Sequence, residues 1–224
     1  MDNDFEPRKD ERLTAEEFIR ANTALKSPSL VAELKLHLAD EALPLWQKTE
    51  EELSQDGLSP PFWAFAWAGG QALARYVLDN PFVVAGRRVL ELGAGGGIAA
   101  IAAARAGARP VAANDIDPFA VAAASLNAAA NGVEVELSCA DILDGAPAAE
   151  VLLIGDLFYE QPLADRALAM AQRMASAGSD VFVGDPSRTF MPKDALVPLK
   201  TYAVPTPREL EDADVKRTTV WRLR

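Results

Sequence analysis

A glycine-rich segment beside an acid offers the clearest chemistry in this sequence. Glu91-Leu-Gly93-Ala-Gly95-Gly-Gly97 follows an apolar pair and precedes an alanine-rich stretch that ends at Arg105. A strand that turns on glycines into a helix lets a ligand lie against the backbone, because a Cβ would block that approach. The amides at the helix N-terminus then face the ligand. The pattern therefore predicts a ligand-binding loop that includes Gly93, Gly95 and Gly97.

Two acids near this loop distinguish the candidate ligands. Glycine loops also bind NAD, and residues 95–100 match the GxGxxA form. Glu91 stands where a carboxylate can hold the cationic methionyl end of S-adenosylmethionine, directly or through water, and where it would repel a pyrophosphate. Asp115 lies 24 residues later (115 minus 91), after the next expected strand, about where an acid contacts ribose hydroxyls. These acids favour S-adenosylmethionine over NAD, and we assign the adjacent Ile116 to the same site.

The residues near Asp115 have other expected roles. Asp117 precedes Pro118 and is predicted to cap the following helix. In Ala140-Asp141-Ile142, after the third expected strand, Asp141 can accept a hydrogen bond from the adenine amino group while Ile142 packs against the ring. The alternative is that Asp141 is only a turn residue.

The segment Asp156-Leu-Phe-Tyr159 follows the fourth expected strand, and ligands of doubly wound sheets bind at the carboxyl ends of strands. Methyl transfer to an amine is an in-line displacement, in which Asp156 and the Tyr159 hydroxyl can orient the nitrogen. Phe158 or Tyr159 can also exclude water around a lysine side chain. Asp156, Phe158 and Tyr159 are therefore the candidate catalytic residues, and Asp156 also borders the cofactor. The alternative is that Phe158 packs in the core and Tyr159 only caps the sheet.

Four aromatic residues lie between Pro61 and Gly69, a density that suggests the wall or lid of a pocket. Trp67 is the first candidate to contact the cofactor, Phe65 is the second, and Trp63 is a candidate core residue. In Gly184-Asp-Pro-Ser-Arg188, the loop can shape the acceptor channel or be held by an internal pair between Asp185 and Arg188.

Short apolar segments alternate with alanine-rich stretches beyond residue 86, a pattern typical of a doubly wound parallel sheet. We predict an α/β fold, the Rossmann-like seven-stranded doubly wound sheet of class I methyltransferases with an N-terminal helical extension. Residues 1–60 form the extension and residues 61–224 the S-adenosylmethionine-dependent methyltransferase domain. The expected strands are 88–92, 110–114, 134–139, 151–155, 180–184, 199–204 and 217–223, and the expected helices are 69–78, 97–105, 118–131 and 161–176.

In the extension, Thr14-Ala-Glu-Glu17 has the capping-box pattern that begins a helix, and Ser27-Pro28 ends it. A second amphipathic stretch runs from Leu30 to Leu38, and we assign it to the helical extension as well. The single histidine of the chain, His37, is expected at a helix surface or the edge of the core.

The composition excludes several functions. A net charge of -11 disfavours nucleic-acid binding over distance and favours a basic partner. One cysteine, Cys139, excludes an intramolecular disulfide, and with one histidine it leaves too few ligands for structural zinc, so no metal is expected. Cys139 is expected to be a buried packing residue. Without a long apolar segment or a targeting pattern, the chain is expected to be cytoplasmic and to bind no membrane.

Several of these segments together resemble a known family. Residues 62–76, the loop 91–97, residues 113–117 and Asp156-Leu-Phe-Tyr159 are similar to the seven-β-strand (class I) protein-lysine methyltransferases, and within them to the bacterial electron transfer flavoprotein β-subunit lysine methyltransferases. The likeness extends to residues 18–46. The glycine loop is shared by many methyltransferases, whereas the aromatic segment and Asp-x-Phe-Tyr are more specific. Ala68 and Ser187 stand where the family often has proline and glycine.

The resemblance implies that the substrate is the electron transfer flavoprotein β subunit. Its methylated lysines would lie on the loop by which the flavoprotein docks its dehydrogenases, and methylation would weaken that docking. A small amine such as nicotinamide is the second candidate acceptor. A nucleotide-binding module without catalysis is the third hypothesis, and measured transfer to any acceptor separates it from both enzymes.

Overall fold

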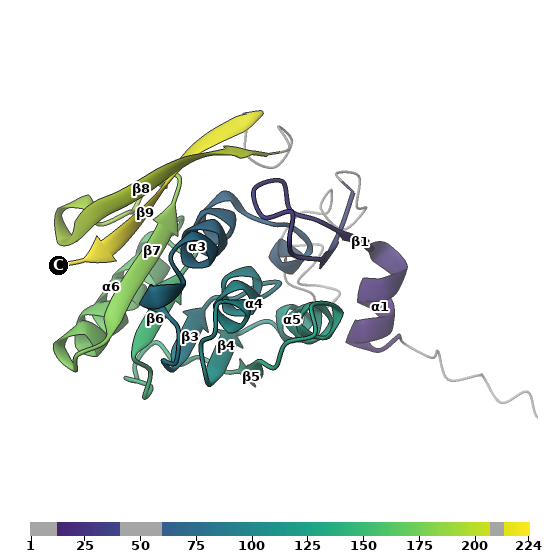
Figure 1. Cartoon of the computed structure of the whole chain (residues 1–224), viewed down its shortest axis with the longest axis horizontal. Helices are drawn as coiled ribbons and strands as arrows, with labels where there is room; N and C mark the ends of the chain where they lie inside the picture. Colours follow the sequence, from purple (N-terminus) through teal and green to yellow (C-terminus); the bar gives the residue numbers. More distant parts are fainter. Residues whose placement is uncertain (1–12, 41–59, 207–212) are drawn as a thin grey trace, which may run out of the picture.

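The computed structural model describes residues 13–40, 60–206 and 213–224, and its centre is a seven-stranded sheet flanked by helices (Figure 1). The strand order is β5-β4-β3-β6-β7-β9-β8. Strands β3 to β7 are parallel, and β9 runs antiparallel to both of its neighbours. The bounds are Val89–Leu92 (β3), Val111–Asp115 (β4), Glu136–Cys139 (β5), Val151–Ile154 (β6), Asp180–Asp185 (β7), Leu196–Pro205 (β8) and Val215–Leu223 (β9).

This order contains a switch point between β3 and β6. The chain moves from β3 outward to β4 and β5, and then returns to the other side of β3 as β6. In open α/β sheets the crevice at the carboxyl ends of two such strands is where ligands bind. The glycine loop after β3 and Asp156 after β6 therefore lie at the same edge of the sheet, on the two sides of this switch point.

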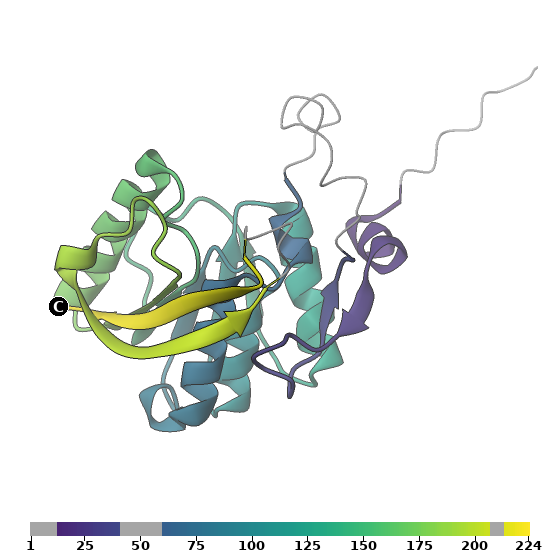
Figure 2. The same ribbon diagram turned by 90° about the horizontal axis from the view of Figure 1, so that it is seen from above.

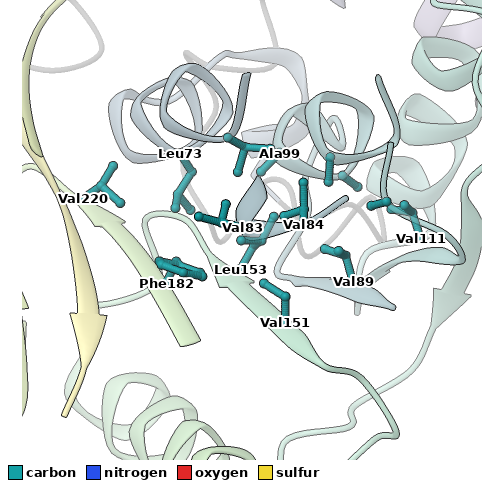
Figure 3. Close-up of a cluster of buried hydrophobic side chains, with 14 of the residues drawn as sticks. Leu73, Val83, Val84, Val89, Ala99, Val111, Val151, Leu153, Phe182 and Val220 are labelled. Atoms are coloured by element: carbon teal, nitrogen blue, oxygen red, sulfur yellow. The ribbon is translucent and has the colours of Figure 1, made fainter. Parts of the chain in front are cut away.

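Helices cover the two faces of the sheet according to the alternation of side chains along each strand. Val89, Leu153 and Phe182 pack with residues of α3 and α4 in one core cluster (Figure 3). Leu90 and Leu152, one position away, pack with α6 in a second cluster. The helices are Ala68–Asp79 (α3), Ile98–Arg105 (α4), Pro118–Ala130 (α5) and Gln161–Ser176 (α6), with short 3-10 turns at Phe62–Ala64 (η1), Pro81–Val83 (η2) and Lys193–Ala195 (η3). Consecutive apolar residues, whose side chains point alternately to the two faces, thus produce a sheet buried on both faces.

The predicted sheet and its C-terminal hairpin are confirmed, and each strand and helix of the predicted domain lies within a few residues of its expected bounds. Local rules account for this agreement. Asp117 accepts a hydrogen bond from the Phe119 N–H at 2.8 Å and caps α5, with Pro118 in the first turn.

The N-terminal extension is only partly helical. Helix α1 (Ala15–Asn22) begins with the predicted capping box of Thr14 and Glu17. Beyond it, Ala24–Lys26 (β1) and Leu36–Leu38 (β2) pair as two antiparallel strands, so the helix expected from Leu30 to Leu38 is wrong. The apolar side chains of this stretch are buried against α3, α4 and α5 instead of forming one helical stripe.

Figures 1 and 2 show α1 and the β1–β2 pair beside α5, at the end of the molecule opposite the β8–β9 hairpin. Ile19 of α1 is fully buried in a cluster with Ala123 and Leu126 of α5. The described part of the extension therefore contributes to the core of the methyltransferase-like domain. Among the described residues, no helix is long and apolar enough to cross a membrane.

Candidate cofactor and acceptor site

The loop between β3 and α4 is shaped by three glycines at positive φ. Gly93, Gly95 and Gly97 have φ values of 62°, 51° and 75°, a region that side chains rarely adopt. A Cβ on Gly93 would lie 2.5 Å from the Leu157 Cδ2, so the loops after β3 and β6 are in close contact. A Cβ on Gly95 would be in ordinary contact with Trp63 Cα, at 3.8 Å, so the aromatic segment lies against the loop there.

Asp115 ends β4 and binds this loop directly. Its Oδ2 accepts from the Gly95 N–H at 2.8 Å and its Oδ1 from the Asp117 N–H at 3.0 Å. The side chain is half-buried, and the neighbouring Ile116 is 73% exposed. A carboxylate and an uncovered apolar side chain thus stand side by side at the edge of the glycine loop. This is the arrangement that a ribose and an adenine ring require, and contact with them stays a prediction.

Glu91 lies behind the loop and is 2% exposed. Its carboxylate accepts from the N–H groups of Ala99 and Ala100 at 3.2 and 2.7 Å, in the first turn of α4. Burial raises the pKa of Glu91 to about 8, with a smaller contribution from the charge of Asp115, although the two backbone hydrogen bonds oppose this shift. The structure therefore gives Glu91 a role in fixing α4 to β3, and its contact with a methionyl group stays a prediction.

The end of β5 and the loop after it hold Cys139, Asp141 and Ile142, and only Cys139 differs from expectation. Asp141 accepts from Arg166 of α6 at 3.0 and 3.1 Å and from the Leu143 N–H, and these hydrogen bonds hold the pKa of Asp141 below its usual range. Ile142 is half-buried against the core. Cys139 is exposed at the end of the edge strand, so its assignment as a buried packing residue is wrong. His37 lies half-buried on β2, and its Nδ1 is 3.2 Å from the Thr23 hydroxyl.

The aromatic segment packs against both site loops. Trp63 is buried and stacks on Phe119 with ring centroids 6.1 Å apart, which confirms its assignment to the core. Trp67 is half-buried at the N-terminus of α3 and donates from Nε1 to the Phe62 carbonyl at 2.9 Å. Phe65, 8% exposed, contacts the edge of the Trp67 ring. Trp67 is thus fixed at the N-terminus of α3, and its contact with the cofactor stays a prediction.

Asp156 is held at both oxygens. Oδ2 accepts from the Gly70 N–H in the first turn of α3 at 3.0 Å. Oδ1 accepts from Arg188 Nη2 at 2.7 Å and Nε at 3.1 Å. Asp185 and Arg188 are paired within the loop, as the alternative expected, but through the backbone: Asp185 Oδ1 accepts from the Arg188 N–H at 2.7 Å. The Arg188 guanidinium pairs with Asp156.

Tyr159 and Phe158 take opposite positions after Asp156. Tyr159 is 39% exposed, and its ring centroid lies 5.9 Å from that of Phe62, which is equally exposed. Phe158 is 1% exposed within the core beneath α6. The catalytic assignment of Phe158 is therefore corrected to that of a core residue, whereas Tyr159 remains a candidate at the surface of the site.

Sequence reasoning missed the glycines that let α3 approach the site. A Cβ on Gly69 would lie 2.2 Å from the Gly184 carbonyl oxygen and 2.4 Å from Asp156 Oδ2. The available signal was a Gly-Gly pair in an otherwise good helix, since glycine weakens helices and needs a packing reason there. The pairing of Arg188 with Asp156 was also missed, because no local sequence pattern joins residues that are 32 positions apart.

Comparisons with known proteins identify relatives of this chain. The family model described as ribosomal protein L11 methyltransferase matches residues 71–154. The chain is 36% identical to the electron transfer flavoprotein beta subunit lysine methyltransferase of Mus musculus, with 91% of this chain and 82% of that protein covered. Identity to the Danio rerio protein of the same name is 37%, covering 92% and 81%. The chain belongs to the electron transfer flavoprotein β subunit lysine methyltransferase family.

Solved structures agree with this family at the level of fold. A crystal structure of Thermoplasma acidophilum 1320 matches with a TM-score of 0.54 and 20% identity, covering 69% of this chain and 89% of that one. The T. thermophilus 16S rRNA N2 G1207 methyltransferase, in complex with AdoMet and guanosine, matches with a TM-score of 0.52 and 20% identity, covering 71% and 43%. These likenesses show a class I methyltransferase fold.

The L11 methyltransferase match covers β3, the glycine loop, β4 and β6 but stops before Asp156. The aromatic residues of 62–67, Asp156, Tyr159 and Arg188 lie outside it. The match therefore includes the glycine loop and the strands beside it, and it ends before these residues. Among the described residues, no group of three or more His, Cys, Asp or Glu side chains is placed to hold a metal ion.

Proposed function

We propose that this protein is an S-adenosylmethionine-dependent protein-lysine N-methyltransferase, and that its substrate is the electron transfer flavoprotein β subunit. The observation that carries the proposal is the 36–38% identity to relatives of that name. The match reaches 91% of this chain in the mouse relative. It therefore extends well beyond the glycine loop that many methyltransferases share.

The residues at the carboxyl edge fit S-adenosylmethionine. When bound, it supplies a methyl group activated on a positively charged sulfur. Gly93, Gly95 and Gly97 would shape the loop that holds the methionyl part, as their positive φ values support. Asp115 would bind the ribose hydroxyls, with Ile116 against the adenine ring.

Three further side chains complete the proposed cofactor site. Trp67 would border the transferred methyl from the side of α3. Asp141 and Ile142 would lie at the adenine end, where Asp141 can use the lone pairs that Arg166 leaves free. Glu91 would act from behind the loop by holding the first turn of α4, and a cationic methionyl group bound nearby would favour its ionised form.

At the acceptor side, the exposed rings of Phe62 and Tyr159 can pack the methylenes of a lysine side chain. The nitrogen must arrive with its lone pair free, because that pair would form the new N–C bond as the methyl–sulfur bond breaks. The methylated ammonium would then lose a proton to water. Asp156 is paired with Arg188 at Oδ1 and bonded to the Gly70 N–H at Oδ2, so we assign it chiefly to the shape and charge of the channel. The Tyr159 hydroxyl is the candidate group to orient the amine.

The test is transfer of labelled methyl from S-adenosylmethionine by the purified protein. We expect one labelled protein in a cell extract, the size of the flavoprotein β subunit, with methyl groups on lysine by mass spectrometry. An Asp115→Ala variant is the negative control, and we expect it to lose cofactor binding by about 1–3 kcal/mol. Nicotinamide serves as the competing acceptor. Labelling confined to the small-molecule fraction would refute the protein-lysine assignment.

A further inference from the structure

Arg188 joins three elements of the site through one guanidinium group. Its Nη2 and Nε bind the same oxygen of Asp156 after β6, at 2.7 and 3.1 Å. Its Cζ lies 5.6 Å from the centroid of the Trp67 ring at the start of α3. The side chains of Arg188 and Asp156 are only 20% and 13% exposed. The electrostatic attraction within this half-buried ion pair is stronger than within a surface ion pair, because water screens it less.

The turn that presents Arg188 is energetically costly. Ser187 has a φ of 73°, and it is the one non-glycine residue with positive φ in the described part of the chain. Asp185 is 1% exposed, and its Oδ1 accepts from the Arg188 N–H. Its Oδ2 is buried and has no hydrogen-bond partner within the described residues. Strained backbone and an under-satisfied buried carboxylate persist where the surrounding structure fixes a functional geometry.

The same edge must accept an amine in a particular charge state. An unbalanced carboxylate beside the amine would favour the ammonium form, whose lone pair is taken by a proton and cannot attack. Lysine arrives in water as the ammonium, so the charge of Asp156 would work against the reaction. The guanidinium of Arg188 cancels that charge and also occupies the oxygen to which an ammonium would bind.

We propose that Arg188 is a positioning residue for the acceptor amine: it neutralises Asp156 and fixes the Trp67 face, so that the lysine enters the channel uncharged and held by packing. This inference rests on the proposed function. Arg188 touches Asp156 and Trp67 in the structure and acts on the acceptor through them.

The test compares four variants of the full chain, Arg188→Gln, Arg188→Lys, Asp156→Asn and the double variant Arg188→Gln with Asp156→Asn. We expect Arg188→Gln to lower kcat by about tenfold or more while the dissociation constant of S-adenosylmethionine, measured by calorimetry, stays nearly constant. Arg188→Lys should fall in between, because it keeps the charge and loses the two-pronged contact. The kcat of the double variant should fall no further than that of Arg188→Gln alone. An amide in place of the Asp156 carboxylate has no charge left to balance, and it can still accept a hydrogen bond from the Gly70 N–H.

Arg87→Gln is the matched control. Arg87 is a half-buried arginine paired with Asp180 at 2.9 Å, at the amino ends of the strands. Its loss should lower the melting temperature without changing kcat. Equal loss of cofactor binding and kcat in Arg188→Gln, or multiplied losses in the double variant, would overturn the positioning role.

The proposed substrate and the proposed role of Arg188 are tested by different measurements. Rates are measured on whichever acceptor the extract labelling identifies, and its identity is read independently by mass spectrometry. An acceptor other than the flavoprotein β subunit refutes the proposed substrate while the variants still test Arg188 on that acceptor. Absence of transfer to any acceptor by the wild-type chain overturns both proposals.

Discussion

Glu91 gives the site its clearest pH dependence at the level of single residues. Burial raises its folded pKa to about 8, from an ordinary value of 4.5. The folded state therefore holds the proton more tightly than the unfolded state does. Its contribution to stability is fully present below pH 4.5 and is lost as the pH rises through about 8.

The measurement is the free energy of unfolding of the wild type minus that of Glu91→Gln, taken across this pH range. We expect the difference to fall as pH rises, with a slope no steeper than about 1.4 kcal/mol per pH unit. Asp117 and Asp185, whose pKa values burial also raises, are present in both proteins and cancel. A difference that stays flat between pH 4.5 and about 8 would mean that Glu91 is not held neutral by burial.

Ser187 offers a second residue-level test. At a φ of 73° a Cβ is unfavourable, and glycine relieves that cost while it gains some freedom in the unfolded chain. We expect Ser187→Gly to raise the free energy of unfolding by up to about 1 kcal/mol. Ser187→Ala is the control, because it keeps the Cβ and should give no gain in denaturant titrations. Equal stability of the two variants would contradict the strain argument.

At the scale of elements, the approach of α3 to the ends of β6 and β7 positions Asp156. A Cβ on Gly69 would fall 2.2 Å from the Gly184 carbonyl oxygen, and backbone atoms there cannot move without displacing β7. A Cβ on Gly70 would meet only the Ile98 Cγ2 methyl, at 2.9 Å. These two neighbouring glycines therefore differ in what a methyl group would push aside.

We expect Gly69→Ala to destabilise the protein by about 2 kcal/mol or more, despite the better helix propensity of alanine. It should also abolish transfer, because Asp156 would be displaced from the Gly70 N–H. Gly70→Ala should cost less and retain activity, since a side-chain methyl can shift. Thermal unfolding and methyl transfer of the pair provide the check, and similar effects of both substitutions would contradict the proposed contact.

At the scale of the whole molecule, the net charge of -11 acts on the approach of the substrate. A lysine-bearing surface is attracted over distances that salt shortens to about 10 Å at ordinary ionic strength. We expect kcat/KM for the protein acceptor to fall as salt is added, while kcat at saturation and S-adenosylmethionine affinity change little. Stopped-time assays over a salt series measure this. A kcat/KM that does not change with salt would exclude long-range attraction.

The sequence alone determined the features that depend on neighbouring residues. The burial of all four residues of Val89–Leu92 follows from the period of a strand, which points successive side chains to two faces that are both covered. The start of α5 follows from Asp117 and Pro118. The glycine loop was predictable because positive φ restricts the choice of residue at each position. The rule that ligands bind at the carboxyl ends of parallel strands predicted the sheet edge at which Asp115 and Asp156 both lie.

Only the tertiary structure decided which polar and aromatic groups meet. The carboxylate of Asp156 pairs with Arg188, and Phe158 turns into the core while Tyr159 faces outward. The apolar residues before β2 pack separately against α3, α4 and α5, and a helical pattern in the sequence does not predict this packing. These outcomes depend on the path of loops and on atoms distant in sequence. Local spacing cannot encode them, because a loop residue has no fixed period that sets the direction of its side chain.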